Sequence, residues 1–301
     1  MAEAVVQTSD GQLLVREAPP RSLFWMSALR LLRHPQGAFG LVLTAFLVLV
    51  ALGAPYLAPH DPLAIRFGQE LKQPFGQYVL GTDQYGRDIL SRIIWGTRVS
   101  LAIGLVAVAL GALIGVGTGL IGGYWGGRIE TLLSRVWDTI LAFPAILLGV
   151  AVTAALGPGV LNAGIAVAII NMPIFFRITR ASLLVEKEKD YVAAARALGA
   201  TDGRIVCRGI MPNTISPILV QITVAMAQAV LLEAGLSFLG LGAQPPAPSW
   251  GSMLSESRQY LRQAAWFGVF PGVALMALLA GLNALSDALR DVLDPRQINL
   301  R

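Results

Sequence analysis

Six long apolar segments dominate this sequence and limit the folds that it can adopt. They cover residues 37–58, 99–122, 132–156, 160–178, 214–236 and 265–286. A membrane-spanning helix needs about 20 mainly apolar residues, so each segment is long enough to cross a bilayer. The composition agrees, because 55% of the residues are hydrophobic, only 14% are charged, and the mean hydropathy is +0.64. We therefore expect an integral membrane protein.

The pattern within the six segments favours helices over strands. None of them alternates polar and apolar residues over about ten positions, as the strands of a membrane barrel do. Only helices and closed barrels satisfy every backbone hydrogen bond within lipid. The sequence therefore predicts an all-α bundle of six transmembrane helices. In the second segment, Gly111, Gly115, Gly119 and Gly123 recur every four residues and predict a smooth helix face for close packing.

Positive charge is distributed unevenly between the two sets of connecting segments. The side that holds both termini has sixteen of the 23 Lys and Arg residues. The positive-inside rule places this richer side in the cytoplasm. We therefore expect both termini to be cytoplasmic and residues 59–98 and 237–264 to face outside. The net charge of +5 follows from this bias and does not indicate nucleic-acid binding.

The expected organisation follows from these assignments. A cytoplasmic N-terminal tail (1–36) contains SLFWMSALRLLRH, a basic amphipathic stretch that can lie as a helix on the inner leaflet. The remaining parts are a first span (37–58), an outer segment (59–98), a core of five spans (99–289) and a C-terminal tail (290–301). The core includes a cytoplasmic loop at 186–213 and an outer loop at 237–264.

A polar, alanine-rich stretch, YVAAARALGATDGRIVCRGIMPN, follows Asp190 between the fourth and fifth spans. Asp190 can cap a helix of strong helix formers, and Gly199 suits the left-handed position that ends it. Thr201 or Asp202 can cap a second helix that ends before Pro212. We expect two short helices joined by a sharp turn. They either receive a partner protein or lie as a basic pair on anionic lipid.

Two groups of charged residues have alternative interpretations. Glu233, near the outer end of the fifth span, either belongs to a translocation path or makes an interhelical hydrogen bond. Asp83, Arg87 and Asp88, in the block GTDQYGRD, either form a salt-bridged turn or contact a partner on the outside.

The sequence offers little for catalysis or cofactor binding. It has no phosphate-binding pattern G-x-x-x-x-G-K-[ST]. Its two histidines and one cysteine have neither metal-ligand spacing nor a nucleophile and base pattern. We expect no catalytic site, no metal site and no cofactor bound by this chain.

The alanine-rich stretch resembles the EAA loop of ABC importer permeases. Ala194, Ala195, Gly199, Pro212 and Asn213 match its pattern directly. Three residues depart from it: Ala193 replaces the usual Glu, Gly209 a common His and Met211 a Leu.

Three further blocks resemble the same family in the same order along the chain. They are LGTDQYGRDILSRIIWGTRVSL (80–101), LSFLGLGAQPPAPSWGSML (236–254) and ALRDVLDPR (288–296). The resemblance covers residues 80–296 and is to the C-type subunit of dipeptide, oligopeptide, nickel or glutathione importers.

The resemblance implies a type I ABC importer permease fold in the bacterial inner membrane. Its loop would form coupling helices that dock in a groove of cytoplasmic ATPase subunits. One or two such ATPases would bind ATP and Mg²⁺, beside a second, B-type permease and an extracytoplasmic solute-binding protein. The implied ATPase-coupling residues are Ala193, Ala194, Ala195, Arg196, Gly199, Asp202, Arg204, Pro212 and Asn213. Within such an importer, Glu233 is the candidate for the translocation path, and Asp83, Arg87 and Asp88 are the candidates for binding-protein contact. The competing hypotheses are an ion-coupled secondary transporter and a membrane scaffold that does not transport.

Overall fold

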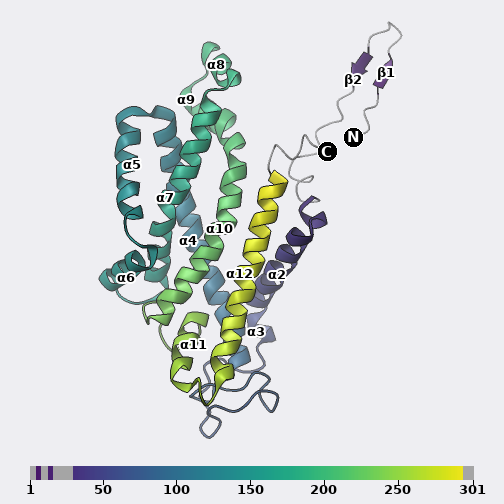
Figure 1. Ribbon diagram of the computed structural model, residues 1–301, viewed down its shortest axis with the longest axis vertical. Coiled ribbons are helices and arrows are strands. Elements are labelled where there is room, and N and C mark those ends of the chain that lie inside the picture. Colours follow the sequence, from purple (N-terminus) through teal and green to yellow (C-terminus); the bar gives the residue numbers. More distant parts are fainter. Residues whose placement is uncertain (1–4, 8–12, 16–29, 294–301) are drawn as a thin grey trace.

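The computed structural model describes residues 5–7, 13–15 and 30–293 of the chain. In this part the chain forms an elongated bundle of long helices (Figure 1), which confirms the predicted all-α membrane fold. The helices long and apolar enough to span a membrane are α2 (Pro35–Leu52), α4 (Ile89–Trp125), α7 (Val160–Lys187), α10 (Met211–Phe238) and α12 (Ala265–Leu293).

Shorter elements connect or precede these helices. α3 (Ala54–Leu57) continues from α2, and α8 (Asp190–Ala197) and α9 (Asp202–Arg204) lie between α7 and α10. A π-helical segment (Ile205–Ile210) joins α9 to α10, and α11 (Trp250–Ser257) with a 3₁₀ turn (Arg258–Tyr260) precedes α12. β1 (Val5–Gln7) and β2 (Leu13–Val15) pair as an antiparallel hairpin ahead of the bundle.

The third predicted span, 132–156, is not a straight helix. α5 (Gly127–Leu141) and α6 (Ala145–Leu156) meet at 92°, so the bundle has six crossings only if this bent pair counts as one. Pro144 explains the break, because proline has no backbone N–H and disfavours helical geometry in the residue before it. α5 lies beside α7, and α6 turns away partway along the bundle (Figure 1).

The second span begins ten residues earlier than predicted. α4 starts at Ile89, and Asp88 caps it by accepting a hydrogen bond from the Ser91 backbone N–H at 2.9 Å. Residues 89–98, with Arg92 and Arg98, had been assigned to the outer segment. Arg92 nevertheless lies inside the helix, because Asp83 and Glu256 are close enough to pair with its charge.

Two predictions about the loop at 186–213 were wrong in detail. Asp190 is the first residue of α8 rather than its cap; Lys189 holds the cap position and makes no side-chain cap bond. The second helix does not end before Pro212, because residues 202–238 form one continuous helical path. Pro212 lies in the first turn of α10, directly after the π-helical segment, where the missing N–H is tolerated.

The predicted glycine face of α4 packs against α7. A Cβ atom built on any of the four glycines would approach an atom of α7 to 3.1 Å or less. Small buried residues continue this contact, including Ala107 of α4 and Ala163, Ala166 and Val167 of α7. The approach is tightest at Gly115 and Gly119, where a Cβ atom would come within 2.5 Å and 2.8 Å of α7.

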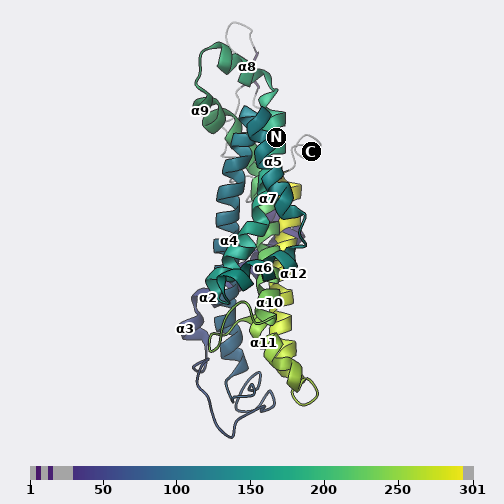
Figure 2. The same cartoon turned by 90° about the vertical axis from the view of Figure 1, so that its left-hand side faces the viewer.

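The bundle has two distinct ends, which both views show (Figures 1 and 2). The start of α2, the end of α12 and the α8–α9 region lie at one end, called here the knob end. α3, α11 and residues 58–88 lie at the other, called the outer end. The predicted tail helix over 22–34 falls largely outside the described residues, as does most of the C-terminal tail.

Candidate functional site

Residues 190–213, called the knob, contain a tight turn between α8 and α9. The Gly199 N–H donates to the Arg196 carbonyl, and the Ala200 N–H donates to the Ala195 carbonyl, both at 3.0 Å. This pair of bonds is a Schellman motif, which requires a left-handed residue after the helix cap. Gly199 occupies that position with φ of 78°, as the sequence predicted.

The tip of the knob presents an exposed apolar side chain. Leu198 is 88% exposed, and Ala193, Ala194 and Arg196 beside it on α8 are exposed as well. The exposed leucine is flanked by small alanine side chains, so both it and the α8 backbone are accessible to a partner surface. Arg204 is exposed on the neighbouring α9, so positively charged side chains lie on both helices near the tip.

The inner side of the knob packs on the ends of two long helices. Val192, Ile205, Val206 and Ile210 form a buried cluster with Leu183 of α7 and Tyr124 of α4. This apolar contact makes the knob part of the bundle rather than a free loop.

Polar contacts hold the base of the knob. The Tyr191 hydroxyl donates to Glu186 at 3.0 Å, and the Asn213 amide donates to Tyr191 at 3.3 Å and to the Gly209 carbonyl at 3.0 Å. Burial and the bond to Glu186 raise the pKa of the Tyr191 phenol. The bond from Lys189 to Glu186 likewise raises the pKa of the Lys189 ammonium. These bonds join the beginning and the end of the knob where it meets the membrane helices.

The outer end contains a buried network of charges. Arg87 Nε lies 2.5 Å from Asp83 Oδ2, and Arg87 Nη2 lies 2.9 Å from Glu256 Oε2. Arg92 is 3.4 Å from Asp83 and 3.5 Å from Glu256. Asp83 is fully buried, and Arg87 is only 5% exposed. The network fastens α11 to the start of α4.

Asp88 belongs to the same region but has a different role. It is 1% exposed and accepts hydrogen bonds from the backbone and hydroxyl of Ser91. Asp83, Arg87 and Asp88 are all buried, and Asp83 and Arg87 form the predicted salt-bridged turn, while contact with a docked protein stays a prediction. The distant partner Glu256 was not predicted, because no local sequence pattern links it to residues 83–92.

Neutralising Asp83 should destabilise the outer end. Asp83→Asn leaves the guanidinium groups of Arg87 and Arg92 buried with less compensating charge, a change that costs about 3 kcal/mol or more. We expect a clearly lower thermal unfolding midpoint in detergent. Glu70→Gln is the matched control, because Glu70 is exposed and bonds only locally to the Gly68 N–H. Equal midpoints for the two variants would contradict a stabilising network.

Glu233 joins two membrane helices. It is fully buried in α10 and accepts hydrogen bonds from Ser100 of α4 at 3.0 Å and from Ser237 at 2.7 Å. Of the two interpretations, the geometry corresponds to the interhelical hydrogen bond. Both donors are hydroxyl groups, so the carboxyl group has polar partners without a paired cation.

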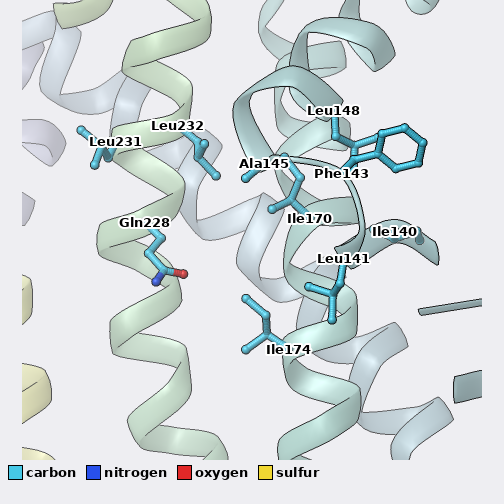
Figure 3. Close-up of a pocket in the computed structure, with 10 residues that line it drawn as sticks. All are labelled: Ile140, Leu141, Phe143, Ala145, Leu148, Ile170, Ile174, Gln228, Leu231 and Leu232. Carbon is cyan, nitrogen blue, oxygen red and sulfur yellow. The ribbon is translucent and has the colours of Figure 1, made fainter. Parts of the chain in front are cut away.

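A cavity of about 360 Å³ lies beside the break between α5 and α6. Figure 3 shows Phe143 and Ala145 at the break, with Gln228 of α10 on the facing helix. Gln228 is the one residue with a polar side chain among the ten that line it. Irregular backbone at membrane depth is tolerated where it lies against protein or a water-filled cavity, and the break at Pro144 fits that condition. The sequence had not indicated this site, because the apolar run hides the bend.

Two sequence families match this chain. Residues 111–299 match the family described as binding-protein-dependent transport system inner membrane component. Residues 22–74 match the N-terminal TM domain of oligopeptide transport permease C.

Curated relatives match over nearly the whole chain. The dipeptide transport system permease protein DppC of Alkalihalophilus pseudofirmus is 43% identical over 273 residues, covering 90% of each chain. DppC of Haemophilus influenzae is 39% identical and covers 96% of this chain and 99% of its own length. The glutathione transport system permease protein GsiD of Pectobacterium atrosepticum is 41% identical over 91% of this chain and 90% of its own.

A solved structure shares the fold. A chain of the MetNI methionine ABC transporter in an inward-facing conformation superposes with a TM-score of 0.57, covering 68% of this chain and 97% of that one at 21% identity. Fold and relatives together define a transmembrane permease of the type I ABC importer fold. The chain belongs to the family of binding-protein-dependent transport system inner membrane components. This membership confirms the resemblance and favours the permease hypothesis over a secondary transporter or a scaffold.

Proposed function

We propose that this chain is one of two different permease subunits of an importer for dipeptides, oligopeptides or a similar small solute. The curated relatives named as dipeptide and glutathione permeases support this substrate range. Solute would cross between the two permeases, and the cavity beside Gln228 is a candidate part of that path. Its apolar walls and single amide suit a small solute that is bound weakly and released.

The knob is the docking site for a cytoplasmic ATPase in this proposal. The observation that carries it is the exposed Leu198 on a rigid turn that is packed against α4 and α7. A basic helix pair that lay on lipid would instead turn its apolar side chains toward the lipid bilayer around the bundle. ATP and Mg²⁺ belong to the ATPase subunits, which supply the hydrolysis that this chain does not perform.

The orientation of the chain in the membrane follows from the assignment of the knob as the ATPase docking site. The knob end is cytoplasmic, with both termini on that side of the inner membrane, in agreement with the excess of Lys and Arg there. The outer end then receives a solute-binding protein. Its docking surface would be exposed residues of 58–88 and the α10–α11 connection rather than the buried side chains of Asp83, Arg87 and Asp88.

Copurification tests the proposal directly. A tagged chain is extracted from its native membrane in mild detergent, and the proteins that remain bound in stoichiometric amounts are identified by mass spectrometry. We expect a second permease and one or two ATPases. A Leu198→Asp variant should retain the second permease and lose the ATPases, because a charge cannot be buried in an apolar groove. Recovery of the unchanged chain without any ATPase would refute the proposal.

A further inference from the structure

The knob is fastened to a helix that is distant from it in the sequence. Tyr124, in the last turn of α4, is 5% exposed, and its hydroxyl donates to the Asp202 carboxylate at 2.5 Å. Its carbonyl oxygen accepts from the Lys187 ammonium at 2.6 Å, and Lys187 Nζ lies 5.4 Å from the centroid of the Tyr124 ring. One residue therefore links α4 both to the second helix of the knob and to the end of α7.

The apolar contacts of Tyr124 and its hydrogen bond to Asp202 restrain the knob in different ways. The apolar cluster around Tyr124 is held by dispersion contacts, which have no preferred direction. The bond to Asp202 is charge-assisted and directional, so it fixes the position of α9 relative to α4. α8 and α9 are otherwise held by the apolar cluster and by their chain connections to α7 and α10, which flank them in sequence.

α4 is also fixed at its opposite end. Asp88 caps its first turn, and Arg92 belongs to the network with Asp83 and Glu256. The helix is continuous over 37 residues, which at about 1.5 Å per residue gives a length of about 55 Å. A movement of its knob end is therefore carried to the outer end by a single helix.

We propose that Tyr124 is a positioning residue that couples movement of the knob to α4, and through α4 to the outer network. The inference rests on the proposed function, in which an ATPase moves the knob. Without the Tyr124 hydroxyl, the knob keeps its apolar packing and its docking tip. It then follows the ATPase while α4 lags behind, so hydrolysis proceeds with less transport.

Tyr124→Phe tests this role, because it removes the hydroxyl and keeps the ring and the carbonyl that Lys187 contacts. The assay uses the complete importer in proteoliposomes with its binding protein, and measures solute uptake and ATP hydrolysis together. We expect unchanged subunit composition, retained hydrolysis and uptake per ATP lowered about fivefold or more, the usual lower range of coupling between sites. Tyr56→Phe is the matched control, because Tyr56 is 93% exposed on α3, and it should keep the wild-type ratio.

Variants of the partner residue distinguish a specific bond from general damage. Asp202→Ala should lower uptake per ATP by a similar factor, and adding Tyr124→Phe should lower it no further, because both changes remove one bond. Asp202→Asn keeps an acceptor oxygen but removes the charge that strengthens the bond, so its ratio should lie between those of the wild type and Asp202→Ala. An unchanged ratio in Tyr124→Phe, or additive losses in the double variant, would overturn the inference. Failure of the unchanged chain to bind any ATPase would instead refute the proposed function itself.

Discussion

Gly199→Val should abolish most solute uptake while the chain still reaches the membrane and assembles. The residue has φ of 78° in the Schellman turn between α8 and α9. A Cβ atom there would meet nothing within 4 Å, so the strain lies in the backbone and not in crowding. A β-branched residue in this conformation costs about 1–3 kcal/mol. That cost is enough to open the turn and misdirect Leu198, and uptake should fall about tenfold or more.

Two substitutions test that backbone explanation. Gly199→Asn should restore much of the uptake, because asparagine adopts left-handed geometry more readily than valine. Gly203→Val is the control, since Gly203 is also exposed and open around its Cβ position but lies in α9 without a positive φ. Uptake is measured in proteoliposomes with the assembled importer. If Gly199→Val transported as well as Gly203→Val, the turn would have no role in coupling.

The sequence predicted the knob turn because local chemistry determines it. Strong helix formers followed by glycine specify a helix and its left-handed end without help from distant residues. The network at Asp83 is the opposite case: GTDQYGRD indicated a local turn, whereas Glu256 reaches it only through tertiary packing. Tyr124 was also missed, because its partner Asp202 is 78 positions away.

The errors in the spans have a common physical origin. A hydropathy window averages residues along the chain and does not register direction, so the apolar run through Pro144 appeared as one helix although α5 and α6 meet at 92°. The same averaging treats an arginine as unsuited to a span. Arg92 is instead paired at the outer end of α4, which therefore starts at Ile89. The four-residue spacing of the glycines, by contrast, shows that they lie on one side of the helix, and it correctly predicted a close-packed face.

Gly115→Ala should strongly destabilise the bundle. The added Cβ atom would lie 2.5 Å from the Met172 carbonyl oxygen and 2.6 Å from Phe175 Cβ. Neither atom is the end of a flexible side chain, so relief requires α4 and α7 to separate. Overpacking of this kind costs about 1–3 kcal/mol, and separation also weakens the dispersion contacts along the glycine face. We expect a lower thermal unfolding midpoint in detergent and a lower yield of folded protein.

The neighbouring position provides a matched control for this prediction. Gly117 lies two residues further along α4, and a Cβ atom there would meet nothing within 4 Å. Gly117→Ala makes the same chemical change in the same helix, and it should be neutral or slightly stabilising, because alanine favours helix over glycine by about 1 kcal/mol. Both variants are compared by fluorescence-detected size-exclusion chromatography after heating. Equal loss in the two would mean that another property of this helix, such as its contact with lipid, and not the α4–α7 approach, requires glycine. A selective loss in Gly115→Ala would show that the close approach of α4 to α7 at this glycine stabilises the bundle.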